Sequence, residues 1–76
     1  MPNITVQLLK GRDVAQRRAF VKDVTDSAVA TLAARRQDVR IVFDEITSDI
    51  VANGGVLASE DPSRAEVVSR LEPHEN

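Results

Sequence analysis

The second residue of the chain is the first candidate for chemistry, because Pro2 directly follows the initiator Met1. Removal of Met1 would leave the nitrogen of Pro2 as a secondary amine at the chain terminus. Inside a chain the same nitrogen belongs to a tertiary amide and has no basicity. A secondary amine that is neutral near the working pH can take a proton from one atom of a substrate and return it to another. Pro2 is therefore a candidate for a general base, on condition that Met1 is removed.

A chain of 76 residues with this composition needs help to fold. A monomer of that size buries only about 60% of the surface that its unfolded chain exposes. The sequence has no Cys for a disulfide, a single His, and only two aromatic residues, Phe20 and Phe43. The usual stabilisers of small domains, disulfides and structural metals, are therefore not available. We expect one domain over residues 1–76 that is stabilised by association with further subunits.

Charge and hydropathy exclude several classes of function. The net charge of −2 gives no general attraction to nucleic acid or to an anionic membrane, although single arginines can bind small anions. The pairs Arg17–Arg18 and Arg35–Arg36 are expected to be solvated helix residues, since aromatic residues for base stacking are absent. No apolar run approaches the roughly 20 residues that span a bilayer. Polar residues begin at Asn3, so we recognise no signal peptide and expect a cytoplasmic protein.

A strand and a tight turn are predicted at the start of the chain. Polar and apolar residues alternate over residues 3–9, and the β-branched content favours a strand. Pro2 stands at its beginning, where the missing N–H costs the sheet least. The turn that follows, residues 10–12, contains Gly11, which can adopt a positive φ.

A helix and a second strand follow the turn. Asp13 and Gln16 have the spacing of a capping box, and apolar residues recur at helical intervals over residues 13–35. Alternation over residues 39–46 predicts another strand. Strand, helix and strand in so short a span predict a β-α-β unit with parallel strands and a right-handed crossover.

The rest of the chain predicts a hairpin and a short helix. Asn53, Gly54 and Gly55 are typical of a turn that joins residues 49–52 to residues 56–58. Asp61 and Pro62 predict the start of a helix that ends near Leu71, with Ala65, Val68 and Leu71 on one side. Residues 72–76, which include Pro73 and His74, are expected to be a frayed tail in which His74 has no function.

The order and spacing of several short motifs resemble the 4-oxalocrotonate tautomerase family. The resemblance runs without gaps over residues 2–59, and residues 60–76 are an extension with a short helix. It implies an α/β fold: a tautomerase-like β-α-β unit with a short C-terminal hairpin that assembles into a homohexamer, a trimer of dimers. The motifs that carry it are Pro2, Leu-x-Gly-Arg at residues 9–12, Val39-Arg40 before the second strand, Glu45, and Gly-Gly-Val-Leu-Ala-Ser at residues 54–59.

The resemblance also implies roles for individual residues. In that family the N-terminal proline is the general acid/base, which places this role on Pro2. Arg12 and Arg40 would bind and polarise the substrate, often from neighbouring subunits, and the backbone around Leu9 would form part of the pocket floor. A guanidinium suits both tasks, because it binds a carboxylate with two hydrogen bonds and stabilises charge on a dienolate oxygen. Guanidinium groups and an apolar pocket should also lower the pKa of the Pro2 nitrogen.

The implied reaction is a proton transfer without cofactor or metal. The substrate would be an unsaturated 2-oxo or 2-hydroxy acid such as 2-hydroxymuconate, which fits bacterial catabolism of aromatic compounds. One position departs from the family. Where the best-known members carry an aromatic residue beside the proline, gap-free matching places Val51, with Ile50 adjacent. A smaller wall of the pocket would leave the amine better hydrated.

Several alternatives stay open. Arg12 can be a solvated residue before a helix, and Arg40 can pair with Asp38 or Asp44. A related enzyme could hydrate, dehalogenate or decarboxylate unsaturated or β-keto acids with a protonated Pro2, but this chemistry needs a carboxylate that activates water, and Glu45 is expected to be structural. A third possibility is a non-catalytic oligomeric subunit of the same fold. A fourth is one half of a hetero-oligomer with a related partner chain.

Overall fold

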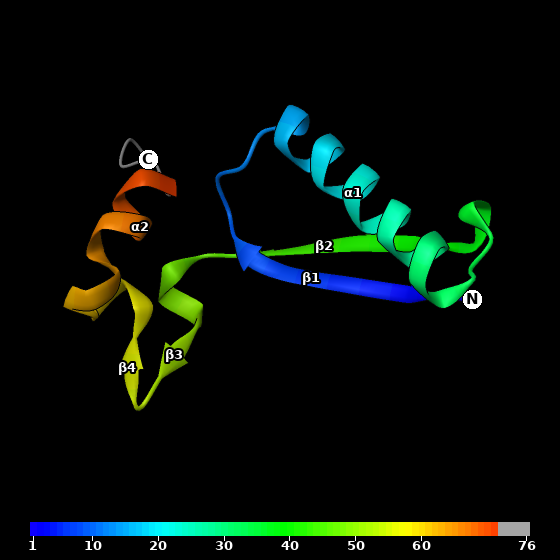
Figure 1. Cartoon of the computed structure of the whole chain (residues 1–76). Coiled ribbons are helices and arrows are strands. Elements are labelled where there is room, and N and C mark those ends of the chain that lie inside the picture. The colour runs from blue at the N-terminus through cyan, green and yellow to red at the C-terminus, as the bar shows by residue number, and fades with distance from the viewer. Residues whose placement is uncertain (72–76) are drawn as a thin grey trace. The chain divides into compact units, whose positions relative to one another are not determined.

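The computed structural model describes residues 1–71, so the predicted tail with Pro73 and His74 lies outside the described residues (Figure 1). The described residues cluster into two compact units, residues 1–6 with 12–44, and residues 7–11 with the chain from residue 45. Among residues 1–71, no helix combines the length and the apolar character that crossing a membrane requires. The elements in chain order are β1 (Asn3–Leu9), α1 (Val14–Leu32), β2 (Arg40–Ile46), β3 (Ala52–Asn53), β4 (Val56–Leu57) and α2 (Ala65–Leu71), with the 3-10 helices η1 (Arg36–Asp38), η2 (Ser48–Ile50), η3 (Ala58–Glu60) and η4 (Pro62–Arg64) between them.

The strands β1 and β2 pair in one two-stranded sheet. At their starts, the backbone N–H of Arg40 donates to the carbonyl oxygen of Pro2 at 3.0 Å. At their ends, the N–H of Lys10 donates to the carbonyl oxygen of Ile46 at 2.8 Å. Start pairs with start and end with end, so the strands run in the same direction, as the sequence predicts. Along β1, Ile4, Val6 and Leu8 are half-buried and alternate with the exposed Asn3, Thr5 and Gln7.

The helix α1 begins with the predicted capping box. The Asp13 carboxylate accepts from the N–H of Gln16 at 2.8 Å, and the Gln16 side chain accepts from the N–H of Asp13 at 3.0 Å. The predicted end at residue 35 is wrong by three residues, because α1 ends at Leu32. Ala33 adopts a left-handed conformation with φ of 56°, which turns the chain back toward β2 and stops the helical hydrogen bonds.

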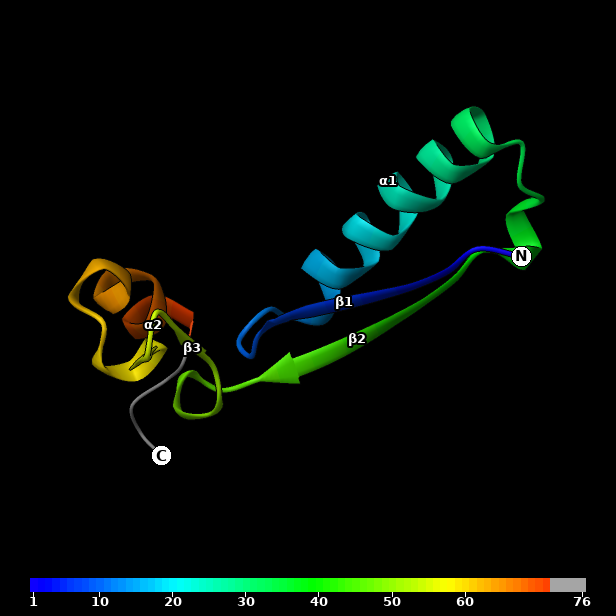
Figure 2. The same ribbon diagram turned by 90° about the horizontal axis from the view of Figure 1, so that it is seen from below.

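One face of the β1–β2 sheet is covered by α1 (Figure 2). The rings of Phe20 on α1 and Phe43 on β2 pack with centroids 5.9 Å apart and planes inclined by 54°, a favourable tilted arrangement. Ala28 lets the helix come close, and its side chain is only 5% exposed. On the opposite face of β2, Val42 keeps 42% of its surface in solvent. Within residues 1–71, the face of β2 that carries Val42 is therefore more open than the face under α1.

The core of a single chain is small. Among residues 1–71, the only buried side chains are those of Ala28, Ala58 and Ser48. No large apolar side chain in this part of the chain is fully buried, and Leu32 remains 65% exposed. Burial of apolar surface is the main force that holds a fold together, so residues 1–71 leave much of their potential stabilisation unused.

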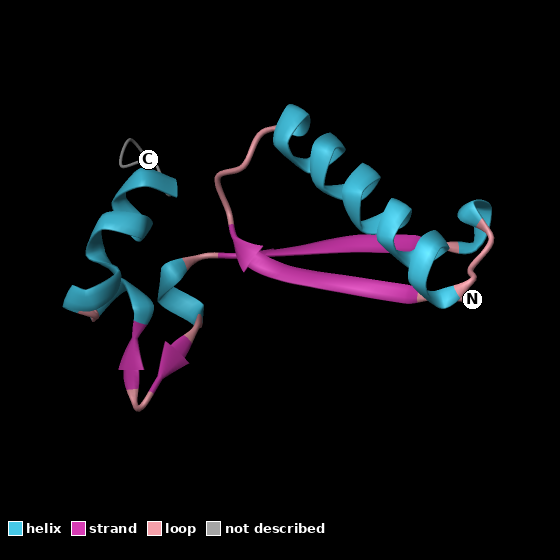
Figure 3. Ribbon diagram, viewed as in Figure 1, coloured by secondary structure: helices cyan, strands magenta, loops and turns pink. Residues whose placement is uncertain are grey.

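In the second unit, the hairpin β3–β4 turns at Gly54 and Gly55 (Figure 3). Both glycines have positive φ, 60° and 82°, which two-residue hairpins of this kind require. The predicted hairpin is confirmed, but both arms differ from residues 49–52 and 56–58: the first is Ala52–Asn53, and the second ends at Leu57 because Ala58 begins η3. Asp49 and Ile50 belong instead to η2, because the N–H of Ile50 donates back to the carbonyl oxygen of Thr47 at 3.2 Å and curls the chain before β3.

The predicted C-terminal helix is present as η4 followed by α2. Asp61 caps it, since its carboxylate accepts from the N–H of Ser63 at 3.0 Å and from the Ser63 hydroxyl at 2.7 Å, with Pro62 at the first helical position. Val68 and Leu71 are half-buried, as expected. Ala65 is exposed, unlike the other two residues predicted on that side, and it stands at the junction of η4 and α2.

Candidate functional site

The structure places Pro2 beside Arg40. Pro2 is half-buried at the entrance to β1, and its carbonyl oxygen accepts the 3.0 Å hydrogen bond from the N–H of Arg40 at the start of β2. The bond uses the oxygen of Pro2 and the backbone nitrogen of Arg40. The Pro2 nitrogen and the Arg40 side chain are therefore not needed to form it. Two residues that the sequence predicts to act together are neighbours on paired strands.

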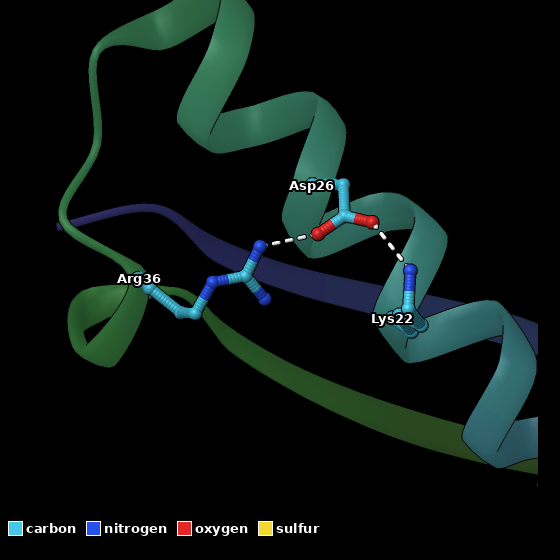
Figure 4. A network of polar contacts seen from close by, with 3 residues as sticks. All are labelled: Lys22, Asp26 and Arg36. Atoms are coloured by element: carbon cyan, nitrogen blue, oxygen red, sulfur yellow. Dashed lines mark hydrogen bonds and ion pairs between the residues drawn. The ribbon is translucent and has the colours of Figure 1, made fainter.

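A cluster of charged residues fixes the chain just before Arg40. The two carboxylate oxygens of Asp26 on α1 bind the Lys22 ammonium at 2.9 Å and the Arg36 guanidinium of η1 (Figure 4). The N–H of Val39 donates to the carbonyl oxygen of Arg36 at 3.2 Å. The cluster thus ties α1 to the turn from which β2 begins.

The two arginines before β2 were predicted to be solvated residues of the helix, and this is wrong in part. Arg35 and Arg36 lie beyond the end of α1, where Arg36 pairs with Asp26 and Arg35 pairs with Asp38 at 2.9 Å. Their side chains stay largely exposed, which is the part of the prediction that is confirmed. Asp38, one of the two partners considered for Arg40, is bound to Arg35 instead.

The charges of this cluster shift the ionisation of its members. Hydrogen bonds from Arg36 and then from Lys22 lower the pKa of Asp26 below its ordinary value of 3.8. The hydrogen bond to Asp26 raises the pKa of Lys22 above 10.5. Both shifts favour the charged forms, so the contacts are formed at neutral pH.

Arg12 is not brought to Pro2 within one chain. It is half-buried between β1 and α1, and its carbonyl oxygen accepts a hydrogen bond from Nη1 of Arg17. Figure 1 shows the N-terminus and the start of α1 at opposite ends of β1. The strand has seven residues and rises about 3.3 Å per residue, so this separation is about 23 Å. An arginine side chain cannot span it.

Leu9 and Val51 belong to the second unit. Leu9 is the half-buried last residue of β1, and Gly11 two residues later has a φ of 132°, which confirms the predicted positive φ. Val51 is half-buried and extended, and its carbonyl oxygen accepts from the N–H of Ala58 at 2.9 Å. Ile50 beside it is 68% exposed. Both predicted pocket residues therefore lie in well-defined backbone, Leu9 before the turn and Val51 at the base of the hairpin.

Comparison with known proteins gives a consistent result. The family model described as "Tautomerase enzyme" matches residues 2–60, which contain Pro2, Arg12 and Arg40 and leave α2 outside. A probable tautomerase of Listeria innocua is 33% identical over 60 residues, which cover 79% of this chain and 98% of the relative. A probable tautomerase of Ralstonia nicotianae is 36% identical over 66 residues, covering 84% of this chain and 94% of the relative.

A solved structure agrees with these relatives. The crystal structure of YwhB, a homologue of 4-oxalocrotonate tautomerase, superimposes with a TM-score of 0.75 at 30% identity and covers 79% of this chain and 98% of YwhB. The β-α-β unit is therefore arranged as in that fold, and the match again leaves about a fifth of this chain unaccounted for.

Proposed function

The chain belongs to the tautomerase enzyme family, and from this premise we propose that it is a cofactor-free isomerase with Pro2 as its acid/base. Its substrate would be an unsaturated 2-oxo or 2-hydroxy acid, with 2-hydroxymuconate as the reference compound. The observation that carries the proposal is the pairing of Pro2 with Arg40 across the strand starts at 3.0 Å. This pairing of the two backbones supports a site in which the Pro2 amine and the Arg40 guanidinium act together.

The proposed chemistry requires Pro2 to be the first residue of the mature protein. Met1 is 83% exposed, so its removal costs little packing. The hydrogen bond that holds Pro2 uses its carbonyl oxygen and would survive the cleavage. The free secondary amine could then take the proton of the substrate 2-hydroxyl group and return the same proton to a carbon of the conjugated chain. No other reactant is consumed, and the protein ends as it began.

The proposed task of Arg40 is electrostatic. Its guanidinium would bind a substrate carboxylate with two hydrogen bonds and stabilise the negative charge that develops on the 2-oxygen during the transfer. A fixed positive charge near Pro2 also disfavours the protonated amine, and so lowers the pKa of the Pro2 nitrogen. The lowered pKa would keep Pro2 in its basic form when substrate is absent.

Arg12 would complete the site from a second subunit. It lies about 23 Å from Pro2 of its own chain by the rise of a strand, so a site with both residues needs two copies of the protein. The open sheet face and the small core of one chain support association. We propose a homo-oligomer, with a trimer of dimers as the expected form, in which each site takes Pro2 from one subunit and Arg12 from another.

The experiment that tests the function is an assay on protein of known mass. The intact mass of protein expressed from its natural start should lack Met1, and the same sample should convert 2-hydroxymuconate, followed by ultraviolet absorbance. The substitution Pro2→Ala should lower kcat by a factor of about 10² to 10⁴, the usual contribution of general acid–base catalysis. A mass that retains Met1, without activity, would instead favour the non-catalytic subunit.

A further inference from the structure

The C-terminal helix α2 contacts the chain next to the proposed substrate-binding residues. It comprises Ala65–Leu71 and lies beyond residues 2–60, the part that the family model matches. A Cβ atom placed on Gly11 would lie 1.8 Å from the carbonyl oxygen of Leu71 and 2.6 Å from its carbonyl carbon. Real side-chain carbons do not come so close to a backbone atom. The backbone of Leu71 is therefore packed directly on Gly11, and only glycine leaves room for it.

This contact is particular to Gly11. The other two glycines, Gly54 and Gly55, also have positive φ, but a Cβ atom on either would meet nothing within 4 Å. Their conformation alone explains their identity. Gly11 meets two demands at once, a φ of 132° and the close approach of α2.

The end of α2 that touches Gly11 is held in place by its own contacts. Asp61 caps η4, which leads into α2, and α2 packs against η3. The N–H of Ala58, at the start of η3, is bonded to the carbonyl oxygen of Val51 at 2.9 Å. The helix is thus attached to the base of the hairpin, and from there its last residue reaches the turn after β1.

The turn is also anchored by the pairing of the strands. Lys10 is anchored by the 2.8 Å bond from its N–H to the carbonyl oxygen of Ile46. Leu9 precedes this anchor, and Arg12 follows Gly11 in the chain. The contact of Leu71 with Gly11 therefore lies between the two residues that are proposed to bind substrate, Leu9 and Arg12.

We propose that α2 is a positioning element that holds the turn of residues 9–11 in its substrate-binding conformation through the contact of Leu71 with Gly11. The effect on substrate binding rests on the proposed function, whereas the contact of Leu71 with Gly11 does not. A helix beyond the family model would then set how tightly this protein binds its acid substrate, and no residue of α2 would touch the reacting atoms.

The first test disrupts the C-terminal end of α2 in the full-length chain. Arg70→Pro should break the last helical turn, because proline removes a backbone donor and collides with the preceding turn. Arg70→Ala is the matched control, since it loses only the exposed side chain that lies 4.0 Å from Glu66. The two readouts are hydrogen exchange of the Lys10 amide by NMR, and the KM and kcat for 2-hydroxymuconate.

Arg70→Pro should speed exchange of the Lys10 amide by roughly tenfold or more, because local opening becomes easier. KM should rise about three- to tenfold, as expected for the loss of about one hydrogen bond to a ligand, with kcat changed by less than about twofold. Arg70→Ala should match the wild type in both. Unchanged exchange in Arg70→Pro would overturn the contact's role, and faster exchange with unchanged KM would overturn its link to substrate.

A second pair of variants tests the same contact from the other side and does not depend on a proline. Gly11→Ala adds a Cβ where Leu71 lies, and Gly55→Ala adds one at another positive φ with open space around it. Only Gly11→Ala should speed exchange of the Leu71 amide and raise KM. In a chain that already carries Arg70→Pro, Gly11→Ala should raise KM by a smaller factor than it does alone. The overlap of its Cβ with Leu71 is already removed there.

The failure of the proposed function would look different. A wild-type protein without activity toward unsaturated 2-oxo acids would overturn that function, and with it the effect on substrate. The exchange measurements would still decide whether α2 holds the turn. Equal Leu71 exchange in Gly11→Ala and Gly55→Ala would show that it does not.

Discussion

Pro2 and Arg40 are joined through their backbones, and the bond involves neither the Pro2 nitrogen nor the Arg40 side chain. Because the sheet bond uses the Arg40 N–H and the Pro2 carbonyl oxygen, side-chain changes at residue 40 do not remove it. Strand pairing and chemistry can therefore be altered separately at this place, which makes variants of Arg40 informative.

Arg40→Ala should lower kcat/KM by a factor of about 10² to 10³, the typical effect of removing one donor that stabilises a developing oxyanion. Arg40→Lys keeps the charge but loses the planar fork, and so should recover only part of the loss. Steady-state kinetics on both variants provide the measurement. Arg40 has no role in substrate binding if Arg40→Ala retains wild-type kinetics while its sedimentation coefficient is unchanged.

The contact between α1 and η1 lies just before the start of β2. Asp26 binds Lys22 along the helix and Arg36 across to the 3-10 turn, so one carboxylate connects two elements. The residues involved are exposed, and exposed ion pairs contribute little to stability. Their value here is geometric, since they guide the chain toward Arg40.

Asp26→Asn should lower the thermal midpoint slightly at neutral pH, with Asp23→Asn as a control that removes the same charge from α1. The folded state lowers the pKa of Asp26, so its contribution is present above 3.8 and is lost as the pH falls through the lowered value. The difference between wild type and Asp26→Asn should therefore vanish in acid. A midpoint difference that persists at the lowest pH where the protein folds would contradict this origin.

The sequence predicted well those elements that carry a local signal of their own. The alternation of β1, the Asp13–Gln16 box and the Gly54–Gly55 turn all act over a few residues, and all three elements are confirmed. The end of α1 at Leu32 was missed because alanine, the residue at position 33, is not typical of a helix stop. η2 was missed because its single turn at Ser48–Ile50 interrupts an otherwise strand-like run.

For the candidate site, the residue types could be predicted but the contacts between distant residues could not. Pro2, Arg12 and Arg40 could be named from their pattern, but the neighbourhood of Pro2 and Arg40 follows from strand pairing between distant parts of the chain. The contact of Leu71 with Gly11 likewise joins residues far apart in sequence. The sequence signal for this contact was Gly11, which provides both the positive φ of the turn and the space for Leu71.

For the molecule as a whole, the uncovered face of the β1–β2 sheet is the main feature that one chain leaves unexplained. Val42 lies on it with 42% of its surface exposed, although β-branched residues favour covered sheets. A partner subunit that covers this face would supply the burial that a short chain cannot supply alone.

Val42→Asp should weaken assembly by at least about tenfold in dissociation constant, because burying an unpaired charge costs more than a core contact gains. Val42→Thr is the matched control, similar in shape and uncharged. Sedimentation velocity over a range of concentrations measures the effect. Assembly as tight in Val42→Asp as in the wild type would show that this face is not the interface.

The most direct test of Pro2 as the catalytic base is the titration of its nitrogen by NMR in protein labelled with ¹⁵N proline. A base at Pro2 should show one ionisation of this nitrogen, at the same pKa as the limb where kcat/KM rises with pH. That pKa should rise in Arg40→Ala, since a nearby positive charge is removed. A Pro2 nitrogen that does not titrate, or a pKa unrelated to the rate profile, would contradict the role of Pro2 as the base.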